Sequence, residues 1–208
     1  MKRIFQLIII LFCQNLFCQE YHFDGFLEYK DTINDDTRLY FYNSNDENHR
    51  LIVFSVGRNI IGRIFDIKNK IFHEHKVTND GNSIKFIYQF SRNWNPKLQK
   101  EGFFHEITEK KIDSTTKEVS GLIYRNNEKK VWSKIEVIIK KNENFKNEEL
   151  INLFTDGIFP NYQSEITSGI PINIKFPYSD LKRNYSLIRK EKINTILTID
   201  NIKIKQYN

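Results

Sequence analysis

Apolar and polar side chains alternate with a period of two through most of this sequence, in short segments separated by turn-forming residues. In one of them Phe23 and Leu27 lie on one face, and Asp24 and Glu28 lie on the other. This period is typical of a strand with one apolar face, because a helix needs a period near 3.6. Asp80-Gly81 is the clearest of the turns. The expected strands are 23–30, 38–43, 51–56, 59–67, 70–78, 83–92, 103–112, 118–125, 130–140, 171–176, 185–190 and 193–200.

These segments predict a mainly β fold of about ten strands, since no alternation of strands with long helices is visible. We expect an antiparallel curved sheet or a partly open barrel. One short helix is expected at about 147–155, because Asn147 can cap it, Glu148 and Glu149 suit its first turn, and an apolar stripe follows. Residues 20–208 are expected to form a single β-rich domain.

Residues 1–19 have the pattern of a cleavable export signal, in which Lys2 and Arg3 precede the apolar run 4–12. The run is too short for a membrane-spanning helix, which needs roughly 20 apolar residues. Cleavage after Cys18 or Gln19 is expected to give an exported chain, periplasmic or extracellular, with no transmembrane segment. Lipidation at Cys18 would hold it at a membrane, although Phe17 stands where a small residue is normally required.

Charge argues against a nucleic-acid partner. The chain has 32 Lys and Arg against 26 Asp and Glu, a formal net charge of +6. Removal of the signal takes away Lys2 and Arg3 and no acid, so the expected mature chain carries +4. Its basic residues are spread among acids, whereas a nucleic-acid site usually gathers them on one element. Both cysteines lie in the signal, so no disulfide is expected.

The segment 168–174, Ser-Gly-Ile-Pro-Ile-Asn-Ile, resembles the signature of exported Bacteroidetes proteins of the Gly-Leu-Pro-Gly-Leu-Ile type. Gly169, Ile170 and Pro171 match that motif, and Ile172 departs from it. The resemblance implies a LolA-like curved sheet with an apolar groove, and an apolar ligand or chain end as partner. Gly169 and Pro171 also have a purely structural interpretation, since glycine permits unusual backbone angles and proline rigidifies a strand entry.

One aromatic stripe is the candidate ligand-binding surface. Ile84, Phe86, Tyr88 and Phe90 are expected on one strand face, where they form core or line a concave apolar pocket. Trp132 is expected to point away from the main apolar set of its strand, toward a second layer or solvent.

His73 and His75 are the candidate metal ligands, because residues two apart on a strand face the same way. A third ligand would come from His105, His22 or Asp66, and the alternative is a solvated strand face. No Gly-x-Ser-x-Gly elbow, phosphate-binding loop or dinucleotide fingerprint occurs, and no cofactor is expected.

The sequence therefore predicts an exported cell-envelope protein that binds an apolar ligand or an envelope protein segment in a curved-sheet groove, without catalysis. The alternative is a structural or interaction module of the envelope that acts through a sheet edge or an aromatic patch. A hydrolase that uses the histidines or a pair of carboxylates is the third hypothesis.

Overall fold

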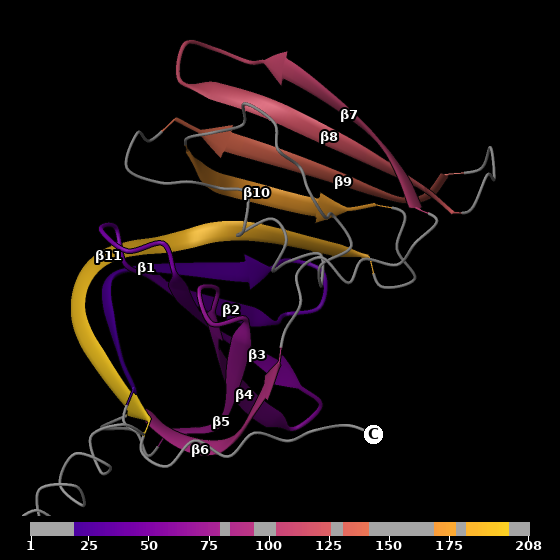
Figure 1. Cartoon of the computed structure of the whole chain (residues 1–208). Coiled ribbons are helices and arrows are strands. Elements are labelled where there is room, and N and C mark those ends of the chain that lie inside the picture. The colour runs from indigo at the N-terminus through magenta and orange to yellow at the C-terminus, as the bar shows by residue number, and fades with distance from the viewer. Residues whose placement is uncertain are drawn as a thin grey trace, which may run out of the picture. The chain divides into compact units, whose positions relative to one another are not determined.

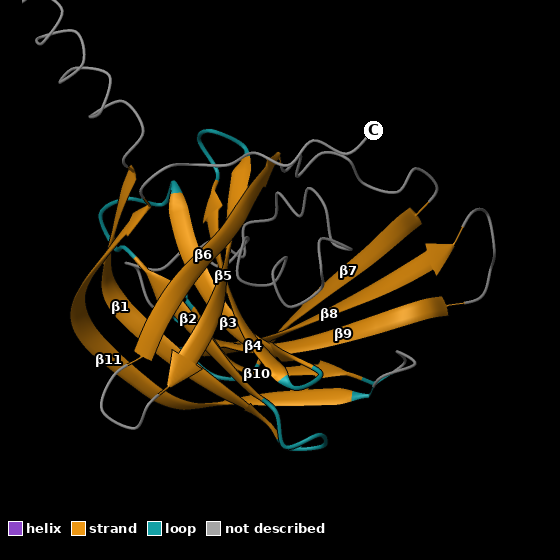
Figure 2. Cartoon of the chain, turned by 90° about the horizontal axis from the view of Figure 1, so that it is seen from below, coloured by secondary structure: helices purple, strands orange, loops and turns teal. Residues whose placement is uncertain are grey.

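The computed structural model describes residues 19–79, 84–93, 103–125, 131–141, 169–177 and 182–199. These residues form strands and turns and contain no helix (Figures 1 and 2). The predicted helix at about 147–155 and residues 1–18 of the predicted signal 1–19 lie outside them, and its last residue, Gln19, begins the first strand. No helix in the described ranges has the length and apolar character needed to cross a membrane. The strands are β1 (Gln19–Asp31), β2 (Thr37–Tyr42), β3 (His49–Val56), β4 (Asn59–Asp66), β5 (Ile71–Asn79), β6 (Ile84–Asn93), β7 (Phe103–Lys111), β8 (Thr116–Arg125), β9 (Val131–Lys140), β10 (Ile170–Phe176) and β11 (Arg183–Ile199).

All eleven strands belong to one antiparallel sheet in the order β6-β5-β4-β3-β2-β1-β11-β10-β9-β8-β7. The chain thus forms two meanders, β1–β6 and β7–β10, and β11 lies between β1 and β10. The sheet does not close into a barrel. The prediction of a mainly β, antiparallel sheet is confirmed.

The prediction was wrong about β11, where two strands were expected at 185–190 and 193–200. The structure has one strand of 17 residues, Arg183–Ile199. The expected strands left a gap at Glu191 and Lys192, but these residues are not glycine, proline or another turn former. Because sheet hydrogen bonds use the backbone alone, an exposed charged stretch can continue a strand.

Two compact units divide the chain. Unit 1 contains the described parts of Met1–Phe26, Tyr40–Trp94 and Glu191–Asn208, and unit 2 contains those of Leu27–Leu39 and Asn95–Lys190. β1, β2 and β11 therefore contribute to both. The buried apolar side chains of unit 1 include Tyr21, Phe23, Phe26, Tyr40, Leu51, Val53, Ile64 and Val77. Those of unit 2 include Leu27, Tyr29, Val119, Ile135, Val137, Ile139, Ile174 and Tyr185.

In unit 2, the carboxylate of Asp31 organises the turn after β1. It accepts hydrogen bonds from the backbone amides of Ile33 and Asn184, at 3.0 and 3.1 Å, and from the side chain of Asn34, at 2.8 Å. Burial raises the pKa of Asp31, but these hydrogen bonds outweigh it and bring the pKa below its usual value. The turn is therefore fixed by a buried carboxylate whose charge is compensated by donors.

Gly169, the first matched residue of the signature segment, lies where a side chain would not fit. Its φ angle is +157°, and a Cβ added to it would lie 2.6 Å from the carbonyl oxygen of Lys140 and from Cγ2 of Ile139. The close approach of β10 to β9 requires glycine here. This contact supports the structural interpretation of Gly169.

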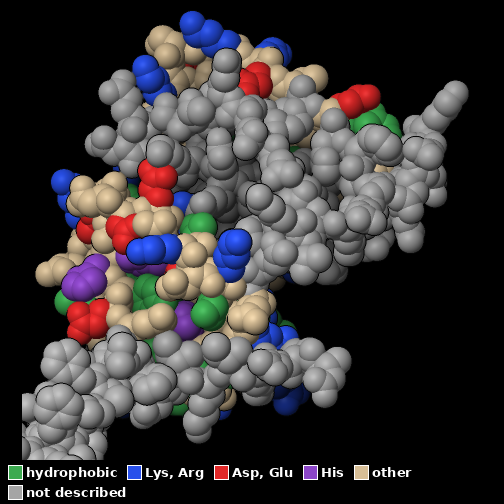
Figure 3. All heavy atoms as spheres, viewed as in Figure 1, with side chains coloured by type: hydrophobic (Ala, Val, Ile, Leu, Met, Phe, Trp, Pro, Cys, Tyr) green, Lys and Arg blue, Asp and Glu red, His purple; other side chains and the backbone are tan. Residues whose placement is uncertain are grey.

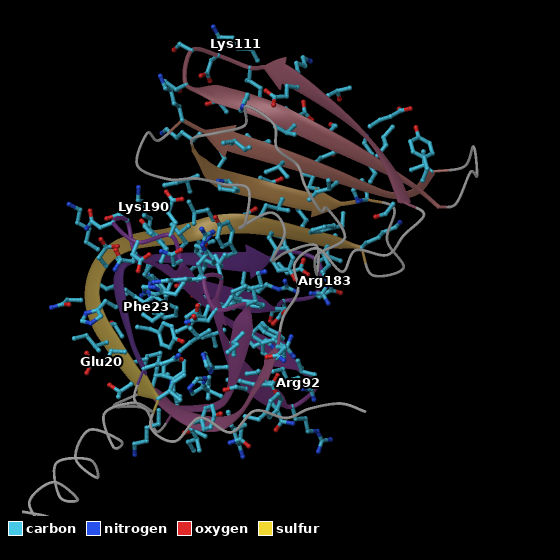
Figure 4. All side chains as sticks on the ribbon, viewed as in Figure 1. Glu20, Phe23, Arg92, Lys111, Arg183 and Lys190 are labelled. Carbon is cyan, nitrogen blue, oxygen red and sulfur yellow. The ribbon has the colours of Figure 1, made fainter. Side chains whose placement is uncertain are left out.

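Curvature of the sheet in unit 1 positions the candidate site. β1 and β5 are separated by three strands, so in a flat sheet they would lie about 19 Å apart. The hydroxyl of Tyr21 on β1 is nevertheless 2.8 Å from Nε2 of His73 on β5. The sheet must therefore curve so that these residues meet across its concave side, where Phe23 also points (Figure 4).

Candidate functional site

The register of β4, β5 and β6 places the predicted histidines on one face of the sheet. His73 pairs with Ile64 and Ser91, and His75 pairs with Gly62 and Tyr88. Directly opposed residues of antiparallel strands project to the same side. We call this side the histidine face, and it includes Gly62, Ile64, His73, His75, Val77, Ile84, Phe86, Tyr88 and Ser91. The prediction that His73 and His75 share a face is confirmed.

A bulge at Gln89 moves Phe90 off the histidine face. His75 pairs with Tyr88 but Glu74 pairs with Phe90, so Gln89 has no opposing residue. One extra residue in a strand reverses the alternation beyond it. Phe90 therefore lies on the opposite face with Glu74, and the predicted single stripe is wrong at this residue. The cause leaves no signature, because Gln89 fits a regular strand equally well.

The other predicted ligand-binding residues are placed as follows. Phe86 and Tyr88 are half-buried on the histidine face. Ile84 pairs with Asn79 on the same face and is 51% exposed. Trp132 belongs to β9 in unit 2, and its side chain lies outside the described part of the structure. The structure thus brings Phe86 and Tyr88 together with both histidines.

A hydrogen-bond network crosses the concave side of unit 1 and ends on the histidine face. The Tyr21 hydroxyl contacts Oδ2 of Asp66 at 3.0 Å, Oε1 of Gln19 at 2.7 Å and Nε2 of His73 at 2.8 Å. On the other side of the ring, Nδ1 of His73 lies 2.6 Å from Oγ of Ser91. The Tyr88 hydroxyl lies 2.8 Å from the same Oγ.

The direction of these hydrogen bonds follows from the carboxylate, which can only accept. If the hydroxyl of Tyr21 donates to Asp66, Nε2 of His73 must carry a proton and donate to Tyr21. Nδ1 then accepts from Ser91, and Ser91 accepts from Tyr88. This assignment satisfies the contacts of Asp66, His73 and Ser91 with one neutral tautomer of His73, while the single Tyr21 proton is shared between Asp66 and the amide oxygen of Gln19.

Burial makes the charged forms of this network unfavourable. It lowers the pKa of His73 to about 4, with the charge of Asp66 acting in the opposite direction and His75 lowering it further. Burial and the negative charge of Asp66 raise the pKa of Tyr21. His73 and Ser91 are both 0% exposed. Because both residues are closed to solvent, the contact between Ser91 and His73 is a structural hydrogen bond.

His75 differs from His73 because one of its ring nitrogens, Nδ1, is not hydrogen-bonded to any described residue. The residue is 3% exposed, and its Nδ1 has no hydrogen-bond partner in the described part of the structure. Its ring meets the rings of Phe86 and Tyr88 edge-on, with centroids 6.3 and 5.7 Å apart. Burial lowers the pKa of His75, while hydrogen bonds with the backbone of His73 and Gly62 act in the opposite direction. The imidazole is therefore neutral and aromatic-lined, and its Nδ1 has no partner of good hydrogen-bond geometry among the described residues.

The positions of His73 and His75 do not favour a metal site. Both ring nitrogens of His73 are engaged by Tyr21 and Ser91. Of the proposed third ligands, His22 is exposed beside Glu20, and the side chain of His105 lies outside the described residues. Within the described ranges no group of three or more His, Cys, Asp or Glu side chains could hold a metal.

Sequence reasoning missed three members of the site, namely Tyr21, His49 and Ser91. The ring of His49 meets Tyr21 and Phe23 edge-on, with both centroids at 5.4 Å. Tyr21 could have been found, because it continues the apolar alternation of Phe23 toward the start of β1. His49 had no such signal, since its partners Tyr21 and Phe23 lie on a strand that is not its neighbour. Ser91 had none, because the bulge at Gln89 places it on the face of His73. Histidine and hydrophobic side chains adjoin on the viewed face of unit 1 (Figure 3).

Comparison of the chain with protein families, curated proteins and solved structures finds no match.

Proposed function

We propose that this protein is an exported binding module, without catalysis, that holds an apolar ligand against the histidine face of unit 1. The ligand is a lipophilic molecule or an apolar segment of an envelope protein. The observation that carries the proposal is the buried Nδ1 of His75, which lacks a partner among the described residues. A buried polar group without a hydrogen bond costs about 1–3 kcal/mol, and a ligand that supplies the partner recovers it.

The surroundings of His75 suit an apolar ligand. Phe86 and Tyr88 meet its ring, and Val77 lies next to it along the same face of β5. Gly62, opposite His75, has no side chain, and Phe86 and Val77 pack closely over it, with atoms 3.1 Å from the position of an added Cβ. Ile84 continues the same face outward to solvent. Sites for small molecules are commonly aromatic and aliphatic, with a few polar groups that fix orientation.

The state of His75 limits the polar end of the ligand. Because burial lowers its pKa, the imidazole is neutral at pH 7 and binds through a hydrogen bond instead of an ion pair. The same burial would penalise a ligand that brought a free charge. The ligand therefore carries a hydroxyl, ester or amide. The resemblance of segment 168–174 to exported proteins with an apolar groove implies a partner of the same class.

Native mass spectrometry tests this proposal, on mature protein purified without detergent from its own cell envelope. We expect an added mass that organic extraction removes. The substitution His75→Phe keeps the aromatic volume and removes Nδ1, so it should lower the ligand-bound fraction about tenfold, as expected for one lost hydrogen bond. His22→Phe, at an exposed position, is the matched control. A bare protein mass, or equal loading of both variants, contradicts the proposal.

The alternative function is an interaction module of the envelope that acts through an aromatic patch. A specific observation favours it: the face of β3–β6 opposite the histidines carries phenylalanine rings in contact with arginines.

A further inference from the structure

The side of β3–β6 opposite the histidine face combines aromatic and basic side chains. The register aligns Phe54, Ile61, Lys76 and Ile87 in one row across the four strands. The next row along the strands aligns Arg63, Glu74 and Phe90. We call this side the cationic face, and it includes Phe54, Ile61, Arg63, Phe65, Phe72, Glu74, Lys76, Lys85, Ile87, Phe90 and Arg92.

Aromatic rings and guanidinium groups are in contact along this face. The guanidinium of Arg63 lies 5.2 Å from the ring centroid of Phe54 and 5.3 Å from that of Phe72. Phe72 meets Phe90 edge-on at 6.4 Å, and the guanidinium of Arg92 lies 4.7 Å from Phe90. Such contacts hold long side chains in place, so the face presents an ordered arrangement. Arg92 is labelled on β6 in Figure 4.

The charge on the cationic face is strongly unbalanced. Among the described residues of this face, Arg63, Lys76, Lys85 and Arg92 are accessible basic side chains, Arg50 opposite Phe65 is a buried one, and Glu74 is the one acid. Nε of Arg63 donates to Oε2 of Glu74 at 2.9 Å, so that carboxylate is already compensated. Lys76 and Lys85 are exposed, and Ile87 between them is 48% exposed. An apolar side chain therefore stands in solvent beside two lysines.

We propose that the cationic face docks on a bilayer surface rich in anionic headgroups. Lysines beside exposed isoleucine fit such a surface, because headgroups supply negative charge and the layer beneath them accepts an apolar side chain. An acidic peptide would use the charge but leave Ile87 without a partner. The proposal rests on the alternative function, an envelope interaction module, and is independent of ligand binding at His75.

Co-sedimentation of the mature protein with phosphatidylcholine vesicles, with and without phosphatidylglycerol, tests the proposal. We expect binding only where phosphatidylglycerol is present, and weaker binding as salt is raised. Lys76→Gln and Lys85→Gln should each weaken the partition about fivefold. Ile87→Ser should weaken it without changing the salt dependence. The matched control is the double variant Lys110→Gln and Lys111→Gln, which removes two exposed lysines of unit 2 and should change binding less than twofold.

Equal binding to both vesicle types overturns the proposal, as does an equal loss in the unit 2 control. Binding to polyglutamate but not to vesicles also overturns it and assigns the face to an acidic protein partner. His75→Phe should leave vesicle binding unchanged. Failure of the membrane proposal is therefore distinguishable from failure of ligand binding on the histidine face.

Discussion

Tyr21 and His73 are 52 residues apart in the sequence and are joined by a 2.8 Å hydrogen bond between the tyrosine hydroxyl and Nε2 of the imidazole. The contact crosses three intervening strands, so it couples the curvature of unit 1 to the orientation of a buried histidine. Through Ser91 the same histidine is tied to Tyr88, next to the proposed ligand contact.

The first prediction concerns the hydroxyl of Tyr21. Tyr21→Phe leaves the side chains of Asp66 and His73 without one partner each, in a buried region. We expect a loss of about 1–3 kcal/mol in the free energy of unfolding, measured by urea denaturation. Tyr124→Phe is the control, because the hydroxyl of Tyr124 bonds to Glu106 at an exposed position, and its loss should change the free energy of unfolding much less. Equal losses in the two variants would mean that the network contributes no stability.

The second prediction concerns pH. Burial lowers the pKa of His73 from 6.5 to about 4 in the folded chain, so below pH 6.5 the unfolded chain binds a proton that the folded chain does not. Stability should fall as pH decreases from about 6.5 to 4, by at most about 3 kcal/mol from this residue. His75 acts in the same direction.

Urea denaturation at several pH values in this window measures the effect. His73→Gln should be less stable at pH 7 and should show a smaller loss between pH 6.5 and 4. If the slope is unchanged in this variant, the pH dependence arises elsewhere in the chain.

The third prediction separates crowding from backbone strain at two glycines. Gly169→Ala places a Cβ 2.6 Å from the backbone oxygen of Lys140 at a φ of +157°, so crowding adds to backbone strain and we expect a loss of about 3 kcal/mol in unfolding free energy. Gly57 has a φ of +60° and no atom within 4 Å of an added Cβ. Gly57→Ala should therefore lose only about 1 kcal/mol, from backbone strain. Similar losses at both positions would contradict the crowding of β10 against β9.

The fourth prediction is that one residue can be deleted from the middle of a strand. Gln89 has no opposing residue, so its removal leaves the pairs His75–Tyr88 and Glu74–Phe90 in place and every side chain on its present face. We expect the deletion to fold with a change of less than about 1 kcal/mol. Deletion of Ile87 is the control, because it reverses the alternation of Ile84–Phe86 and should be strongly destabilising. Circular dichroism and urea denaturation measure both.

Local patterns in the sequence were sufficient for most of the strands, because alternation and turn residues are encoded within a few positions, but they did not predict that β11 is continuous. The shared face of His73 and His75 followed from their spacing alone. The partner of His73 could not be predicted, because Tyr21 reaches it only through the curvature of several strands. The position of Phe90 was missed for a different reason. A bulge is decided by how two strands align, and the residues of β6 are compatible with either alignment.

The bulge at Gln89 also bears on self-assembly. β6 ends the strand order of the described sheet, and Ile84–Ser91 contains a single charge. Such a segment is a template for fibril growth when its edge is regular. A second copy that paired along β6 would lose register at Gln89, so the ladder could not extend through the aromatic residues. The deletion that regularises this strand should therefore shorten the lag time of aggregation.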